Sequence, residues 1–245
     1  MGGIELANNN KLITTAASTV LVANGTDDVF VSQGIATAFV VTDGTVGDDT
    51  ILTFRKNDSL INYRALGDTV VPGANGTIAV DGPGAASSDD IQIIGADGDS
   101  VLTLRYLGTK DGGFAYADAS VRLAGFTEGY VTDDSFNAGS AATTYFYDNA
   151  LGLNLGFDTI NGFGADDRIV TTRRIYDGND SASIEFGGNK VLDLSGEGGP
   201  KATDGQLNPG GQIDVNGTTG DIVSLDFLFE ENVGGVTYYY YGIDA

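Results

Sequence analysis

Short stretches in which apolar and polar residues alternate occur along the whole chain. Such alternation is typical of half-buried β-strands, and no stretch keeps a sustained helical period. Asn-Gly pairs begin at positions 24, 75, 161 and 216 and favour tight turns. The pattern therefore predicts an all-β fold of short strands, among them Val29–Val31, Ala38–Val41, Ile91–Ile94, Val101–Leu104 and Val236–Tyr241.

The chain contains an internal duplication. The segment Asp49–Phe54 recurs as Asp158–Phe163, and the match continues without a gap through Asp58 and Asp167 to Asp68 and Asp177. Because related blocks recur in the same order, the repeat indicates two related units. A second block matches at a slightly larger offset and pairs Ile91 with Ile213, Gly95 with Gly217 and Tyr116 with Tyr238.

The duplication predicts the domain organisation. We expect a first β unit at residues 27–121 and a second at residues 144–245, which ends in a Tyr-rich hairpin. Residues 1–26 form a strand-like extension, and residues 122–143 form a linker. Repeats of about 100 residues are too long for a solenoid of short repeats. The fold class we expect is all-β, with two related β-sandwich or β-roll-like units.

The charge is strongly negative, with 34 acidic and 12 basic residues among 245 and a formal net charge of −22. Such a field repels nucleic acid and anionic membranes and attracts cations. No apolar run approaches the roughly 18 residues of a membrane helix, so we expect no membrane insertion. The first 20 residues lack the basic and apolar regions of a classical signal peptide. Export would therefore use another route.

The residue types argue against catalysis. The chain has no Cys and no His, which excludes thiolate nucleophiles, Ser-His-Asp triads and ordinary zinc sites. Paired carboxylates could serve a glycosidase, but Trp, the usual sugar platform, is absent. We expect a protein that is not an enzyme.

One local motif suggests calcium. Residues 44–52 fit the Gly-Gly-x-Gly-x-Asp-x-apolar-x nonapeptide of calcium-binding β-rolls except at the second glycine. Carboxylate oxygens are hard ligands, and calcium takes six to eight of them. Further acidic turns lie at residues 27–28, 89–90, 97–99 and 133–134, although each alone also reads as a solvated loop. The candidate metal ligands are Asp48, Asp49, Asp58, Asp158, Asp166, Asp167, Asp177 and Asp180.

The segment Asp158–Ile169 resembles the stretch that follows the β-roll in RTX-type secreted proteins, where Asp-x-Ile-x-x-Phe precedes Asp-x-Ile. The resemblance implies calcium-dependent folding outside the cell and type I secretion through a C-terminal signal. The acidic and apolar segments Asp226–Glu231 and Val236–Tyr241 are similar to such a signal, and a final edge hairpin explains them equally well. The chain differs from that family in lacking a tandem array of nonapeptides.

Three functions remain open. The first is an extracellular, calcium-binding structural or adhesive protein, such as a surface-layer, filament or biofilm subunit. The second is a carrier of a small molecule or glycan that uses the Tyr-rich strands, and the third is an accessory or secretion partner of an RTX-like enzyme. We expect residues 8–23 to form a strand that adds to the sheet edge of a neighbouring subunit.

Overall fold

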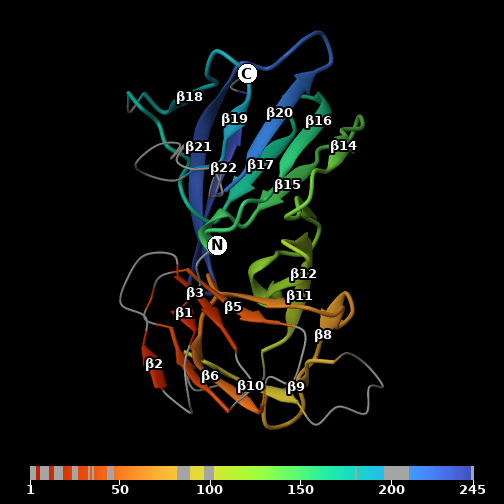
Figure 1. Ribbon diagram of the computed structural model, residues 1–245. Coiled ribbons are helices and arrows are strands. Elements are labelled where there is room, and N and C mark those ends of the chain that lie inside the picture. The colour runs from red at the N-terminus through yellow and green to blue at the C-terminus, as the bar shows by residue number, and fades with distance from the viewer. Residues whose placement is uncertain are drawn as a thin grey trace. The chain divides into compact units, whose positions relative to one another are not determined.

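A computed structural model describes residues 4–5, 11–13, 19–23, 27–32, 34, 36–42, 47–81, 89–96, 102–179, 181–195 and 210–243. The chain divides into two compact units, residues 1–120 and 121–245 (Figure 1). The regular structure of the described residues is strand apart from two short 3-10 turns, η1 (Ala119–Val121) and η2 (Asn149–Leu151). The prediction of an all-β fold is confirmed.

The first unit consists of two sheets. One has the order β1 (Ile4–Glu5), β3 (Thr19–Val22), β5 (Thr37–Val41), β7 (Ser59–Asn62), β12 (Gly113–Asp118), β11 (Leu104–Lys110) and β8 (Thr69–Val70). The other has the order β2 (Lys11–Ile13), β4 (Val29–Val31), β6 (Asp49–Phe54), β10 (Asp90–Gly95) and β9 (Thr77–Ala79).

Successive strands from β1 to β7 alternate between these two sheets and pair in parallel within each. The chain therefore winds as a roll with two strands in each turn. Ile4 pairs with Leu21, Leu21 with Phe39, and Phe39 with Leu60, so the turns take 17, 18 and 21 residues. The strand β10 extends the parallel part, and antiparallel strands complete both sheets.

The second unit repeats this arrangement. Its larger sheet has the order β13 (Thr127–Glu128), β15 (Thr144–Tyr147), β17 (Arg168–Thr171), β22 (Val236–Gly242), β21 (Ser224–Val233) and β18 (Ser183–Glu185). Its smaller sheet has the order β14 (Ser135–Asn137), β16 (Phe157–Phe163), β20 (Gln212–Gly217) and β19 (Leu192–Asp193). Strand for strand, this is the order of the first unit without β1 and β2, which confirms the duplication.

The core of each unit lies between its two sheets. In the first unit Leu21, Phe39, Ile51 and Leu60 are at most 2 % exposed, and they come from alternating positions of parallel strands. In the second unit Tyr145 packs against Phe136 and Phe163, as Phe39 packs against Phe30 and Phe54 in the first. Phe146, at the next position of β15, belongs to a separate cluster with Val170 and Tyr238. Burying each such side chain stabilises a unit by about 1.5–3 kcal/mol. The alternation of apolar and polar residues along the strands therefore stabilises the fold by placing the apolar side chains between the sheets.

The structure corrects two predicted boundaries. Residues 122–143 are no linker, since they supply β13 and β14, which pair in parallel with β15 and β16. These two edge strands read Thr-Glu and Ser-Phe-Asn, and so few apolar residues give no clear strand pattern. Residues 1–26 are no separate extension either, because β2 pairs with β4 and β3 with β5 inside the first unit.

The predicted equivalence of Tyr116 and Tyr238 is wrong by three residues. The Tyr116 hydroxyl accepts the backbone N–H of Leu66 at 2.7 Å, and the Tyr241 hydroxyl accepts that of Ile175 at 2.9 Å. Tyr241 is therefore the counterpart of Tyr116. The reason is that the second hairpin is longer, with 10 residues in β21 against 7 in β11, so matching the glycines of the two turns shifts the tyrosines.

The two tyrosine hydroxyls provide a stability test. Tyr116→Phe and Tyr241→Phe should each lower the free energy of unfolding by about 1–3 kcal/mol, because each leaves a backbone N–H without its acceptor in a buried site. Tyr239→Phe is the control, since its hydroxyl has no hydrogen-bond partner in the described part of the chain, and it should change stability by less than about 0.5 kcal/mol. Urea unfolding curves measure all three, and equal effects would contradict the assignment.

Candidate aspartate row

Three neighbouring parallel strands of the first unit begin side by side at one end of their sheet. Val29 of β4 pairs with Thr50 of β6, and Ile91 of β10 pairs with Asp49 of β6, so the strand starts are in register. An Asp-Asp pair stands at the start of each strand. We call these six residues the aspartate row: Asp27, Asp28, Asp48, Asp49, Asp89 and Asp90.

Hydrogen bonds link the row from strand to strand. Asp27 Oδ1 accepts the backbone N–H of Asp48 at 3.0 Å, and Asp48 Oδ1 accepts that of Asp90 at 3.2 Å. Asp49 Oδ1 accepts the backbone N–H of Asp28 at 2.9 Å. The carboxylates therefore satisfy donors at the strand starts, as side chains do at helix N-termini.

Some oxygens of the row have no such donor. Asp28 is 1 % exposed and Asp49 is 2 % exposed. Among the described residues, neither Asp28 oxygen nor Asp49 Oδ2 has a hydrogen-bond partner. Burial raises the pKa of Asp49 to about 7, and the charges of Asp28, Asp27 and Asp48 raise it further against the backbone hydrogen bond from Asp28. A buried carboxylate without a hydrogen-bond donor raises the free energy of the folded state. A proton or a cation bound at the row would lower it.

The second unit has the equivalent bonds. Asp133 Oδ1 accepts the backbone N–H of Phe157, and Asp158 Oδ1 accepts that of Asp134, both at 2.8 Å. At its start the third strand, β20, has Gly211 and Gln212 where the first unit has Asp89 and Asp90, so it adds no acid to the row. This shorter row therefore concentrates less charge than the row of the first unit.

An aromatic side chain packs against the row of the second unit. Asp158 Oδ2 and the Tyr147 hydroxyl are buried, and neither has a hydrogen bond of normal geometry. Burial and the neighbouring Asp158 raise the pKa of Tyr147 well above its usual value, and burial raises the pKa of Asp158 to about 7. The ring fits only because residue 129 is Gly, since a Cβ there would lie 2.1 Å from Tyr147 Cε1.

Two other predicted ligands, Asp58 and Asp167, have backbone partners on both oxygens. Asp58 Oδ1 accepts the N–H of Thr37 at 3.0 Å and Oδ2 accepts that of Arg55 at 2.9 Å. Asp167 binds the N–H groups of Thr143 and Gly164, both at 2.8 Å. Burial raises the pKa of Asp58 to about 6, and its hydrogen bonds oppose that rise. Asp58 and Asp167 are therefore equivalent residues, and each links the backbone of its own turn to that of a neighbouring strand.

The remaining predicted ligands are spread out. Asp48 and Asp166 are exposed, and the Asp177 oxygens accept the N–H groups of Asn179 at 3.2 Å and Ala182 at 2.9 Å. Asp180, residues 44–46 of the nonapeptide and residues 97–100 lie outside the described residues. Within the described ranges, no three acidic side chains come together in an arrangement that could hold a metal ion.

The sequence-based ligand set omitted Asp28, which has the least satisfied carboxylate of the row. A signal was present in the sequence, because one Asp-Asp pair directly precedes β4 and another spans the start of β6. Its meaning depends on knowing that these strands are parallel neighbours.

Comparison with family models, with curated proteins and with solved structures finds no match to this chain. In the part of the chain that the structure describes, no helix has the length and apolar character needed to cross a bilayer.

The raised pKa values predict an unusual pH dependence. The folded-state pKa of Asp49 and of Asp158 is about 7 against an ordinary 3.8, so between these values the folded state binds more protons than the unfolded chain. With chelator present, the free energy of unfolding should therefore fall as pH rises from about 4 to 7. Urea midpoints at pH 5, 6, 7 and 8 measure it.

The variant Asp49→Asn should flatten this dependence, because it keeps an acceptor oxygen and removes the charge. Asp166→Asn is the matched control, since it makes the same change at an exposed position. A stability that rises between pH 5 and 7, or a control that flattens it equally, would contradict the assignment.

Proposed function

We propose that this chain is a non-enzymatic structural protein of the cell exterior whose first unit binds calcium at the aspartate row. The observation that carries the proposal is the set of three buried carboxylate oxygens on Asp28 and Asp49 that lack donors. A hard divalent cation would satisfy these oxygens and offset the repulsion among six neighbouring acids. Asp28 and Asp49 are the residues that would hold it.

The affinity we expect is modest. Two buried carboxylates supply fewer oxygens than the six to eight that calcium takes, so backbone carbonyls and water would complete the shell. Calcium sites of extracellular modules have Kd values of roughly 10⁻⁴–10⁻³ M. A site of that strength would fill only where calcium is abundant, so the calcium site and the extracellular location are proposed together. Secretion by the type I route stays a prediction.

A structural role is favoured over catalysis by what the described acids do. Asp27, Asp48, Asp58 and Asp167 accept backbone N–H groups that tie neighbouring turns together. Groups used in this way hold the roll in register and are poorly placed to transfer protons to a substrate. The acids of both units thus contribute to rigidity.

Calcium should stabilise the first unit. A ligand that binds only the folded state adds RT ln(1 + [L]/Kd), which is about 1.4 kcal/mol when the free ligand is ten times Kd. We expect the unfolding temperature at pH 8 to rise between chelator and 5 mM calcium, measured by calorimetry. The rise should shrink at pH 5, since protons compete for Asp49, whose pKa is about 7.

Variants locate the effect. Asp28→Asn and Asp49→Asn should abolish the calcium-dependent rise, whereas Asp166→Asn, which removes one equally negative but exposed charge, should preserve it. An unfolding temperature that is the same in chelator and in calcium would exclude the metal from the function.

Self-association is the second part of the structural role. Residues 8–23 supply β2 and β3, which pair with strands of the first unit, and this corrects the expectation that the segment is one strand left to add to a neighbouring subunit. The strands β1 and β2 complete the sheets of their own unit. Each is nevertheless the last strand of its sheet. An edge strand presents backbone donors and acceptors that another copy can pair with.

Deleting residues 1–18 tests this association. The second unit begins its roll with β13 and β14, the counterparts of β3 and β4, so a roll without β1 and β2 is a complete fold. The shortened chain should fold and be monomeric, whereas the full chain should form larger species at high concentration in calcium. Light scattering after size exclusion distinguishes them, and a full chain that stays monomeric would refute the association.

A further inference from the structure

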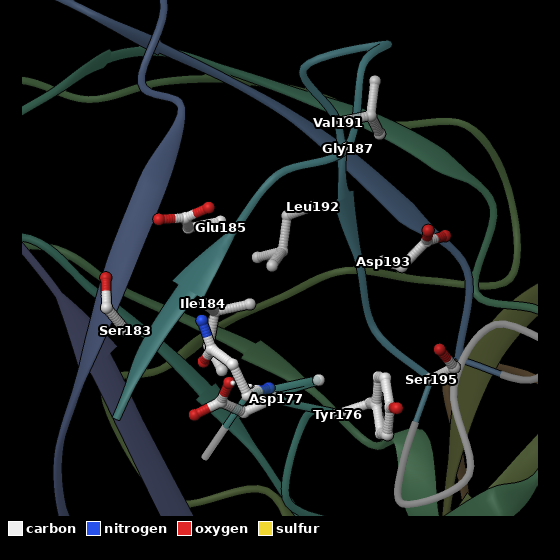
Figure 2. Close-up of a pocket in the computed structure, with 12 residues that line it drawn as sticks. Tyr176, Asp177, Ser183, Ile184, Glu185, Gly187, Val191, Leu192, Asp193 and Ser195 are labelled. Atoms are coloured by element: carbon white, nitrogen blue, oxygen red, sulfur yellow. Dashed lines mark hydrogen bonds between the residues drawn. The ribbon is translucent and has the colours of Figure 1, made fainter. Parts of the chain in front are cut away.

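The second unit contains a cavity of about 350 Å³ between β18 and β19, the last strands of its two sheets (Figure 2). Ile184, Val191 and Leu192 line it and are at most 8 % exposed, so its floor is apolar. In Figure 2, Tyr176 and Ser195 lie at one end of the cavity, and Ile184 and Leu192 lie toward its middle.

One wall of the cavity comes from a loop that is longer in this unit than in the first. Between β17 and β18 the chain has 11 residues, positions 172–182, whereas between the equivalent β7 and β8 it has 6, positions 63–68. The longer loop supplies Tyr176 and Asp177 to the lining. Asp177 Oδ2 holds the loop by accepting the N–H of Ala182 at 2.9 Å, and Ala182 has a positive φ of 67°. A non-glycine residue in that conformation costs energy and is often found at functional sites.

The polar groups of the lining are arranged around this apolar floor. Ser195 is 4 % exposed, and its hydroxyl has no hydrogen-bond partner among the described residues. Asp193 Oδ1 accepts the side-chain amide of Gln212 at 2.7 Å, and Glu185 adds a further carboxylate to the lining. The Tyr176 side chain is 42 % exposed, so part of its ring is open to a ligand. Lys and Arg are absent from the described residues that line the cavity.

We propose that this cavity binds a neutral saccharide, with one sugar ring seated between Tyr176 and the apolar floor. The C–H face of a sugar ring is apolar and can pack on an aromatic ring, while its hydroxyls donate to carboxylates and bond to a serine hydroxyl. Glu185 and Asp193 provide such acceptors, and a sugar hydroxyl would give Ser195 the partner that it lacks. An anionic ligand would meet three lining carboxylates and no cation. The volume is within the range of small-molecule sites.

This site is separate from the aspartate row, since its lining residues belong to the second unit and the row belongs to the first. Saccharide binding does not depend on the proposed calcium site, and the two can fail independently. If both hold, a structural protein with a sugar site would attach to a glycan surface.

The test uses the full chain with glucose trisaccharides linked α1→4 or β1→4 as neutral probes. A uronic acid trisaccharide and a glucosamine trisaccharide serve as the anionic and cationic comparisons. Calorimetry in chelator should show at least one neutral probe bound with a millimolar or lower Kd. Tyr176→Ala should weaken that binding at least tenfold and Ser195→Ala several-fold, with unchanged unfolding temperatures. Phe157→Ala removes an aromatic side chain of similar exposure, 45 %, outside the cavity and should leave Kd unchanged.

Four results would overturn the proposal. The first is no binding of either neutral probe at 10 mM, and the second is binding that Tyr176→Ala leaves intact. The third is preference for the cationic probe over both neutral ones, because that would show that charge and not the sugar face is recognised. Loss of binding in chelator alone would also contradict it, since the site as argued needs no calcium.

Discussion

Parallel pairing of short strands brings the starts of neighbouring strands to one end of a sheet, and their backbone donors there need acceptors. Aspartate carboxylates supply the acceptors in both units, as Asp49 does for Asp28 and Asp158 does for Asp134. A slip of one residue would turn each strand's apolar side chains away from the core, so bonds that hold the strand starts in register also protect the packing. The rest of each roll, including its core, depends on this constraint.

The same constraint creates the chemistry of the first unit. Placing an Asp-Asp pair at three adjacent strand starts crowds six carboxylates, and the strands bury some of them beyond the reach of water. Each carboxylate can satisfy a backbone donor, but together they repel one another and leave oxygens unpaired. Protons or cations are the two ways to relieve this strain, which is why the pKa of Asp49 and the proposed calcium site have one physical origin.

Comparison of the two units shows how a duplicated scaffold diverges. The Asp-to-backbone bonds and the tyrosine-to-backbone bonds persist in both, because losing any of them would leave a buried donor without an acceptor. The differences lie where the roll is not constrained. The second unit fills the side of its row with Tyr147 over Gly129, lengthens its last hairpin and extends the loop before β18. The longer loop supplies Tyr176 and Asp177 to one wall of the cavity, and the shorter loop of the first unit has no residues to build that wall.

The sequence by itself determined the all-β class, the duplication and the equivalence of Asp49 with Asp158, because alternation and local similarity are properties of contiguous residues. It misplaced the boundary at residues 122–143, where polar edge strands carry too few apolar residues to be seen. It also misaligned Tyr116, since the length of a hairpin shows only in its pairing. Only the tertiary structure decided that Asp28 lies against Asp49, that Asp58 binds backbone donors and that Tyr176 stands beside Ser195. Those contacts join residues about 20 positions apart, and long-range strand pairing, not local pattern, sets which side chains meet.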